Sequence, residues 1–389
     1  MTAKAPMREA IFLLALASLN SGIALRVVEP MLPQLASDFG DSVSTTSIII
    51  TAYAFAYAGA QLVHGPVGDR FGKLRVVTLT LFGAAAGSFG CAFAQDIGSL
   101  AAMRFFTGLF ASTPVILGMA YIGDHVPVGE RQPVIARFIM GTITGQALGP
   151  VIGGAVSDWV GWRGAFAMIG TVFVIVAGVL LARTRGQWAE SRGASFEGNP
   201  FGVHWRLLHV PRVRRVLVVG GVETFFFFGA FSFLGAYFKL HFGFSLTLAG
   251  AILAGFGIGG VLYSLMVRKL LMEFGQRGLV LGGGVLCFVF YVLTTLTPEW
   301  PLLVACTTGL GFAFYMLHNT LQLKATEMAS EARGTAVAMY SSAWALGQAT
   351  GVAAMGACVG LFDYAPSIVA FGVGYLLLGV WLRRNLERL

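Results

Sequence analysis

Five ionisable side chains stand inside long apolar stretches of this 389-residue chain: Arg26, Glu29, Arg104, Glu223 and His318. If those stretches cross a membrane, a charge at the centre of one costs about 2.5–3.5 kcal/mol on insertion scales, so such residues mark functional sites by default. Carboxyl and imidazole groups can carry protons, and a guanidinium group can attract an anion. We therefore take Glu29, Glu223 and His318 as candidates for proton coupling, and Arg104 as a functional candidate whose role is considered with its motif below.

Arg26 and Glu29 stand three residues apart, which places them on one face of a helix where they can pair. One interpretation is that Glu29 takes up and releases a proton while Arg26 attracts an anionic group. The alternative is a neutralised pair with only a packing role.

Glu223 is followed by Thr224 and four phenylalanines. A carboxyl group in such an apolar setting can take up a proton on one side of a membrane and release it on the other. The alternative is a structural pair with an arginine that faces the cytoplasm. His318 stands beside Asn319, and an unperturbed imidazole changes charge between pH 5 and 8. A hydrogen-bonded packing role is the alternative for His318.

The composition indicates that lipid is the solvent for most of the chain. Hydrophobic residues make up 56% of the sequence, charged residues 11%, and the mean hydropathy is +0.77. A soluble protein carries about 25% charged residues. The apolar runs have the length of about 20 residues that a spanning helix needs, and they lack the alternation of barrel strands. We expect an all-α membrane protein with twelve transmembrane helices at 10–34, 44–64, 76–95, 98–121, 133–157, 164–182, 214–238, 246–267, 278–297, 301–323, 334–360 and 365–382.

The net charge of +8 indicates topology rather than a nucleic-acid partner. With the N-terminus in the cytoplasm, the predicted connections on that side hold every basic residue except Arg26, Arg104, Arg163 and Lys239. This is the positive-inside pattern. We expect both termini in the cytoplasm and a location in the inner membrane of a bacterium. The basic start could also suggest a signal peptide, but the further spans indicate a first helix that stays.

Four short matches recur in the same order at an offset of about 202 residues, which indicates two related halves. They pair Phe71-Gly72 with Phe274-Gly275, Thr107-Gly108-Leu109 with Thr308-Gly309-Leu310, Arg131 with Arg333, and Gly145-Gln146-Ala147 with Gly347-Gln348-Ala349. We expect two pseudo-symmetric six-helix bundles over 1–183 and 214–389, joined by a cytoplasmic linker over 184–213. In such parallel-repeat proteins the substrate binds between the bundles, near the bilayer midplane.

The four cysteines, Cys91, Cys287, Cys306 and Cys358, all fall in predicted spans and lack metal-ligand spacing. We expect free thiols, no metal and no cofactor. The chain has no Gly-x-x-x-x-Gly-Lys-Ser/Thr loop, so direct use of ATP is disfavoured.

The segment between the second and third predicted helices reads Gly65-Pro66-Val67-Gly68-Asp69-Arg70-Phe71-Gly72-Lys73-Leu74-Arg75. Its glycines permit a tight turn, and Asp69 can pair with basic residues across helix ends. The segment closely resembles the signature loop of the major facilitator superfamily, on the residues Gly65, Asp69, Arg70, Gly72 and Lys73. The resemblance implies that Asp69 locks one conformational state by contacting neighbouring helix ends. The alternative is a tight basic loop, and the second copy around Phe274-Gly275-Gln276-Arg277 lacks the Asp.

Arg104 lies in the pattern Leu100-x-x-x-Arg104-x-x-Thr107-Gly108. This is similar to the family's helix-4 motif, whose Arg is implicated in proton coupling, although Thr107 stands where Gln is common. Because Arg104 lies about one turn from the predicted outer end of its helix, snorkelling of its side chain to the interface is the alternative.

The fifth predicted helix carries glycines four residues apart and a proline, at Gly141, Gly145, Gly149, Pro150, Gly153 and Gly154. Tight helix packing alone would explain them. The Gly-Pro-x-x-Gly-Gly ending resembles the motif of the superfamily's drug:proton antiporters, which implies export. Helix 1 departs from that group, because Arg26 stands where an Asp is common and Glu29 precedes Pro30. Export of a cationic drug is therefore less expected.

A cavity for an amphipathic solute needs polar and aromatic side chains. Tyr53, Tyr57 and Gln61 lie four residues apart on one helix face. The other candidates are Arg26, Phe227, Phe231, Tyr237, Tyr315, Asn319, Trp344 and Gln348. For the aromatic residues, packing or lipid contact is the alternative.

Together the residues and the resemblance predict a proton-coupled secondary transporter, not an enzyme, that exports a small amphipathic or anionic organic compound by alternating access. The near alternative is a proton symporter that imports a small organic anion, which Arg26 favours. An intramembrane enzyme or a receptor is disfavoured, because the spans show no Ser/His, His-Glu-x-x-His or paired-Asp constellation. The expected partners are a small-molecule substrate, protons and the lipid bilayer, with no nucleic acid, and the expected state is a monomer.

Overall fold

The computed structural model describes residues 4–188, 200–329 and 332–389, so Arg192 of the predicted linker lies outside the described residues. The described residues form helices and no strand. The helices are α1 (Lys4–Arg26), η1 (Glu29–Met31), α2 (Leu32–Phe39), α3 (Val43–Thr46), α4 (Ile48–Phe71), α5 (Lys73–Ala92), α6 (Ile97–Ala111), α7 (Thr113–His125), α8 (Val128–Val160), α9 (Trp162–Thr184), η2 (Arg185–Gln187), α10 (Pro200–Leu208), α11 (Pro211–Phe242), α12 (Leu246–Leu253), α13 (Gly255–Leu296), α14 (Trp300–Glu327), α15 (Arg333–Phe362), α16 (Tyr364–Asn385) and η4 (Leu386–Arg388).

Eleven helical segments of the described chain are long and apolar enough to cross a membrane. One of them, Leu246–Leu296, has 51 residues and therefore a length of about 75 Å, which is enough for two crossings. Its backbone leaves the helical region at Gly275, where φ is 61° and ψ is 176°. Such a positive φ suits glycine. The segment therefore turns at Gly275 and crosses twice, which confirms the predicted fold of twelve transmembrane helices.

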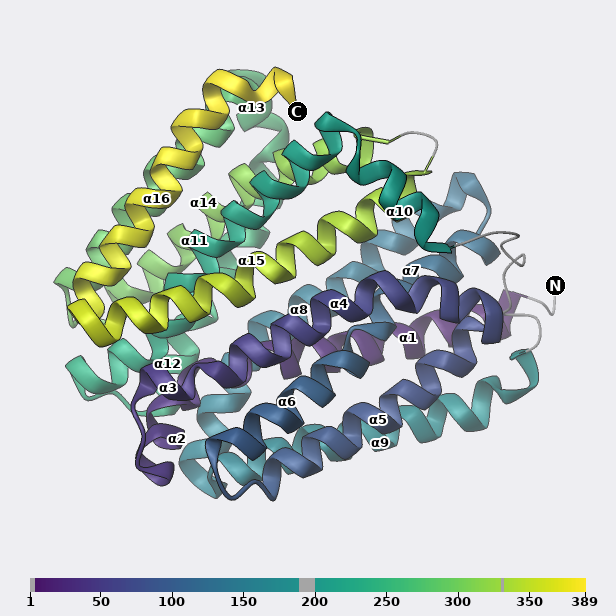
Figure 1. Ribbon diagram of the computed structural model, residues 1–389, viewed down its shortest axis with the longest axis horizontal. Coiled ribbons are helices and arrows are strands. Elements are labelled where there is room, and N and C mark those ends of the chain that lie inside the picture. Colours follow the sequence, from purple (N-terminus) through teal and green to yellow (C-terminus); the bar gives the residue numbers. More distant parts are fainter. Residues whose placement is uncertain (1–3, 189–199, 330–331) are drawn as a thin grey trace.

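The helices gather into two groups, with α1 to α9 in one and α11 to α16 in the other (Figure 1). The short helix α10 stands between the groups, toward the end of the molecule that holds both termini. We call this the inner end. The opposite end, where α2, α3 and α12 lie, is the outer end (Figure 1).

Helix α8 approaches α1 so closely that its glycine face has no room for side chains. A Cβ at Gly145 would lie 2.0 Å from the Leu19 carbonyl oxygen, and a Cβ at Gly153 would lie 2.0 Å from that of Val27. The face also includes the contacts of Gly141 with Ala15 and of Gly149 with Ile23. Small residues four apart allow such backbone contact. This packing holds the end of α1 firmly against α8.

The same helix contacts the second half with its other side. A Cβ at Gly154 would lie 2.1 Å from the Leu246 carbonyl oxygen, and a Cβ at Gly250 would lie 2.2 Å from that of Pro150. The Gly-Pro-x-x-Gly-Gly segment therefore packs on α1 within its own half and on α12 across the interface.

Asp158, one turn beyond Gly154, joins the halves at the outer end. Its carboxylate accepts hydrogen bonds from the backbone N–H groups of Leu246 (3.3 Å) and Thr247 (2.7 Å) and from the Thr247 hydroxyl (2.6 Å). The first N–H groups of a helix lack partners inside the helix, and the helix dipole favours a negative charge there. Asp158 thus binds the N-terminus of α12.

Further contacts between the halves follow α4 and α15 from the outer end to the middle of the molecule. The Thr51 hydroxyl donates to the Ala349 carbonyl (3.3 Å), and the Ser342 hydroxyl donates to the Ala58 carbonyl (2.9 Å). Closer to the inner end, a Cβ at Gly65 would meet no atom within 4 Å.

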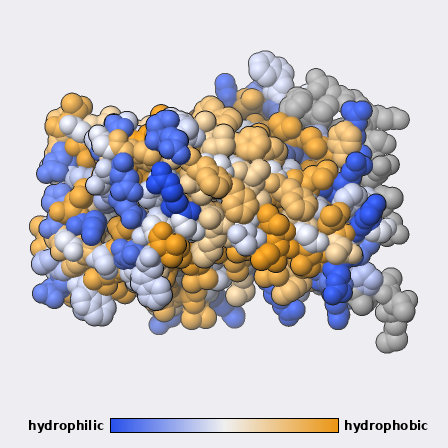
Figure 2. Space-filling model, turned by 90° about the horizontal axis from the view of Figure 1, so that it is seen from below, coloured by the Kyte–Doolittle hydropathy of each residue, from blue (hydrophilic) through white to orange (hydrophobic). Residues whose placement is uncertain are grey.

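The surface carries the band of side chains that a bilayer requires. Figure 2 shows hydrophobic side chains over the middle of one face and hydrophilic ones toward its two ends. Large apolar residues such as Leu79 on α5 and Ile175 on α9 are more than half exposed. Acyl chains would cover them in a membrane.

We expect Asp158→Asn to weaken the closure of the outer end without unfolding the protein. The amide loses the charge-assisted bonds to α12, which contribute about 1–2 kcal/mol, so molecules open at this end should become about 5- to 30-fold more frequent. Spin labels on the outer connections of the two halves would measure this as a longer distance. Asp41→Asn, at an exposed carboxylate of the same end, is the matched control. An unchanged distance distribution in Asp158→Asn would contradict the role of Asp158 in holding the outer end closed.

Candidate functional site

The first cluster of buried charge lies where α1 ends. This helix ends at Arg26, and η1 begins at Glu29 with Pro30 in its first turn. The Nη1 of Arg26 donates a hydrogen bond to Oε1 of Glu29, and both side chains are at most 2% exposed. The pair that the three-residue spacing predicted is therefore present, inside the protein.

Groups of the second half complete this cluster. The Ser232 hydroxyl of α11 donates to Oε1 of Glu29 (3.3 Å), and the Arg26 guanidinium lies 3.9 Å from the ring centre of Phe228. A cation over a ring face is attracted by the ring's electrons. In the described part of the chain, Nη2 of Arg26 and Oε2 of Glu29 are buried without a hydrogen-bond partner. Because buried polar atoms are nearly always paired, these two atoms can still bind a ligand or a proton.

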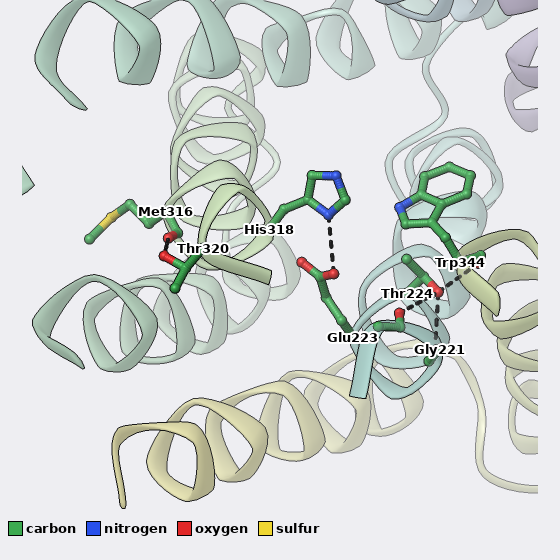
Figure 3. A network of polar contacts seen from close by, with 8 residues as sticks. Gly221, Glu223, Thr224, Met316, His318, Thr320 and Trp344 are labelled. Carbon is green, nitrogen blue, oxygen red and sulfur yellow. Dashed lines mark hydrogen bonds and ion pairs between the residues drawn. The ribbon is translucent and has the colours of Figure 1, made fainter. Parts of the chain in front are cut away.

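The second cluster pairs Glu223 with His318 (Figure 3). Oε2 of Glu223, on α11, lies 3.1 Å from Nδ1 of His318, on α14. The Glu223 side chain is fully buried, whereas that of His318 is 13% exposed and stacks on Phe314 with 4.8 Å between ring centres. The alternative for Glu223, a structural pair with an arginine, is wrong, since the ionisable group paired with it among the described residues is the imidazole. Sequence reasoning named both residues but did not pair them.

Beside this pair, α11 is tied to α15. The Thr224 hydroxyl donates to the Trp344 carbonyl at 2.7 Å (Figure 3). The side chains of Trp344 and Tyr315 are partly exposed, so they and His318 offer aromatic and polar surface together.

Arg104 is buried rather than extended to the interface. Its side chain is 1% exposed, its Nη1 donates to the Ala24 carbonyl (2.9 Å), and its guanidinium lies 4.0 Å from the ring centre of Tyr53. Snorkelling, the alternative for this residue, is therefore wrong. Ala24 lies in the last turn of α1, where the carbonyl groups lack partners and the helix dipole favours a cation. Arg104 thus stabilises the helix end that carries Arg26.

The signature segment is more helical than its glycines predicted. Helix α4 continues to Phe71 and α5 begins at Lys73, so the connection is the single residue Gly72, with φ of 95°. Asp69 lies inside α4 and binds the Lys73 ammonium at 2.6 Å. The same ammonium binds Asp124 of α7, also at 2.6 Å. Lys73 therefore joins the inner ends of α4, α5 and α7 within one half.

The predicted cavity residues fall into different places. Tyr53 is buried beneath Arg104 and stacks on Tyr57, and Gln61 is buried on the same helix. Gln348 is fully buried, with no hydrogen-bond partner for its amide in the described part of the chain. Asn319 lies beside Tyr263.

Two of the aromatic candidates pack away from a cavity. Phe227 is fully buried among rings of the second half, including Phe228 and Phe314. Tyr237 lies toward the outer end of α11 and donates to the Thr295 carbonyl (3.2 Å). These contacts are those of packing residues, the alternative given for the aromatic candidates, and the assignment of Phe227 and Tyr237 to a cavity stays a prediction. Phe231 is also buried but lies 5.6 Å from the Arg26 guanidinium.

Sequence reasoning missed His64. Its imidazole is buried in α4, with Nδ1 3.1 Å from the Thr113 hydroxyl and 3.2 Å from the Ser112 hydroxyl. These two residues lie where α6 passes into α7. A histidine inside an apolar span was the available signal, and its position one residue before the signature segment obscured it.

The sequence of this chain is similar to those of known transporters. A sequence model described as the Major Facilitator Superfamily matches residues 14–327 and also 216–388. The chain is 28% identical over 361 residues to the MFS-type transporter YwfA of Bacillus subtilis, an alignment that covers 89% of this chain and 86% of that one. Shorter alignments at 31% identity relate it to the riboflavin transporter RibZ of Clostridioides difficile, over 34% of this chain and 29% of that one, and to an efflux pump of Gibberella moniliformis, over 39% and 26%.

Among solved structures, a bacterial homologue of the human lysosomal transporter Spinster, in an inward-facing and unoccupied conformation, has the same fold. The TM-score is 0.81 at 16% identity, over 99% of this chain and 98% of that one.

The two buried arginines should differ in what their removal does to stability. Arg26→Met leaves the Glu29 carboxylate buried without its cation, which costs about 3–5 kcal/mol of unfolding free energy. Arg104→Met should cost only about 1 kcal/mol, because its described contacts are a carbonyl group and a ring, and no opposite charge is left behind. Unfolding in detergent measures both.

The double variant Arg26→Met/Glu29→Gln should recover most of the loss, since both charges are then gone. Equal destabilisation by the two single arginine variants would refute this difference.

Proposed function

The chain belongs to the major facilitator superfamily, and on that premise we propose that it is a proton-coupled secondary transporter that exports a small amphipathic organic compound by alternating access. The observation that carries the proposal is the Glu223–His318 pair, a fully buried carboxylate held 3.1 Å from the imidazole of a less buried histidine. Exchange requires that proton and substrate exclude one another. His318 is the more exposed member, so a substrate that hydrogen-bonds its imidazole competes with both Glu223 and the proton.

The direction of transport is supported by two further features. The Gly-Pro-x-x-Gly-Gly segment of α8 resembles the motif of drug:proton antiporters, and part of the chain is 31% identical to an efflux pump. A proton that enters down a potential of 100 mV supplies about 2.3 kcal/mol, in addition to the pH gradient. That energy would drive the substrate outward.

The arrangement of the halves supports an inward-open state. Asp158 and the α4–α15 contacts join the halves from the outer end to the middle, and the Spinster homologue with the same fold is described as inward-facing. In this state Lys73 is bound to Asp69 and Asp124 within one half. We propose that Asp69 controls this state. We also propose that the protein works as a monomer in the inner membrane of a bacterium, with both termini in the cytoplasm.

A second function, import of a small organic anion together with a proton, is favoured by the Arg26–Glu29 pair. A proton on Glu29 removes the charge that neutralises Arg26, and the guanidinium is then free to bind an anion. Proton and anion would therefore bind together, which is the requirement for symport rather than exchange.

Proteoliposomes with a pH gradient of either sign separate the two functions. If the protein exchanges substrate for protons, labelled substrate should accumulate inside vesicles whose interior is the more acidic side. Accumulation with the more acidic side outside would contradict export and support symport. The labelled substrate is the compound that most stabilises the protein in a thermal-shift screen of neutral, anionic and cationic aromatic compounds. Riboflavin is included because a relative is named as its transporter.

Two carboxamide variants identify the proton carrier. Glu223→Gln should still exchange labelled for unlabelled substrate. The accumulation of substrate that a pH gradient drives should fall at least tenfold, because the amide cannot take up the proton. Glu29→Gln should keep that response. The matched control is Glu327→Gln, at an exposed carboxylate near the inner end of α14. The reverse pattern, with loss only in Glu29→Gln, would refute the role of Glu223 and favour the symporter.

A further inference from the structure

The inner end of the second half has a groove whose lining includes no residue of the two buried charge clusters. Its volume is about 950 Å³, and residues of α13 and the end of α16 line it. One part of the lining is basic, with Arg277, Arg383 and Arg384, and another part is apolar, with Leu281, Val285 and Leu286. A groove of this kind has to be filled by a molecule that is itself both charged and apolar.

The basic part has more positive charge than the protein neutralises. Arg277 pairs with Glu387, and Glu273, the one carboxylate in the lining, lies 3.9 Å from Lys269. Arg383 and Arg384 are exposed in the last turn of α16, and the described part of the chain gives them no carboxylate partner. An anion is therefore needed to complete this end of the groove.

The apolar part extends from the arginines toward the middle of the membrane. Leu281 and Val285 are four residues apart on one face of α13, and the side chain of Val285 is 41% exposed. From Arg277 to Leu286 the helix rises about 13 Å, close to the thickness of hydrocarbon in one leaflet, about 15 Å. The wall thus has the depth of one lipid's acyl chains.

The corresponding turns of the two halves differ in charge. In the first half, Asp69 and Asp124 bind Lys73 at the turn between α4 and α5. At the corresponding turn, aligned on Phe71-Gly72 and Phe274-Gly275, Met272 and Gln276 replace Asp69 and Lys73. The second turn therefore lacks both the aspartate and the lysine that pair in the first turn.

We propose that the groove binds an anionic glycerophospholipid of the inner-side leaflet. Its phosphate lies at Arg383 and Arg384, where guanidinium groups donate charge-assisted hydrogen bonds. Its acyl chains lie along Leu281 and Val285. A small soluble anion would leave the apolar wall uncovered, and a zwitterionic lipid would leave the positive charge only partly compensated.

Native mass spectrometry of the full chain, delipidated in detergent and titrated with phosphatidylglycerol, tests the proposal. We expect one lipid bound with a dissociation constant at least tenfold lower than that of phosphatidylcholine. Arg383→Gln/Arg384→Gln should bind phosphatidylglycerol about 30-fold more weakly, because each basic residue near a membrane surface contributes roughly a factor of five. Arg383→Lys/Arg384→Lys keeps the charge and should lose much less, which separates lost binding from misfolding.

The matched control is Arg214→Gln/Arg215→Gln, which removes two exposed arginines from the inner end of α11, outside the groove. It should bind the lipid as the wild type does. Equal affinity for the two lipids, or equal loss in the two glutamine variants, would overturn the proposal. Displacement of the lipid by millimolar glycerol 3-phosphate would also overturn it, since the site would then recognise a soluble anion.

Discussion

A charge that water cannot reach must be neutralised by the protein itself, and the arrangement of α1, α8 and α11 follows from this requirement. Arg26 lies at the end of α1, and its neutralising partner Glu29 follows within one turn. The glycine face of α8 lets the backbone of α1 lie close, and α11 brings Ser232 to the carboxylate. A buried ion pair seldom stabilises a fold more than apolar residues would. Among the described residues, one nitrogen of Arg26 and one oxygen of Glu29 are buried without a hydrogen-bond partner, so stability alone does not explain the pair.

The contacts between the halves suit an interface that has to open and close. At the outer end they are backbone approaches of Gly154 and Gly250 and the bonds from Asp158 to the start of α12. These contacts are specific in geometry, because no side chain fits between the backbones. They join backbone to backbone, or a carboxylate or hydroxyl group to backbone, so they can separate while the side-chain packing inside each half stays in place. Two rigid halves that meet in such contacts can rock against each other without unfolding.

Features that depend on neighbours in the chain could be predicted from the sequence. The twelve crossings follow from run length, the Arg26–Glu29 pair from a spacing of three, and the flat face of α8 from glycines four apart. The Glu223–His318 pair could not be predicted, because 95 residues separate its members and helix packing alone brings them together. The signature segment was expected to be a loop because glycine and proline are frequent in turns. Only Gly72 needs a positive φ there, so α4 continues through Pro66 to Phe71.

Both clusters of buried charge meet on α11, and this sharing is what can couple them. Glu223 and Ser232 are nine residues apart on that helix, a rise of about 13 Å. Through Glu223, α11 contacts α14 of its own half, and through Ser232 it contacts the Glu29 carboxylate of the other half. A change in the contact between Glu223 and His318 would alter how α11 sits against α14. Because a packed helix moves as a rigid body, that shift also changes the contact of Ser232 with Glu29. The two clusters are therefore linked to each other, and to the contact between the halves, through a single helix.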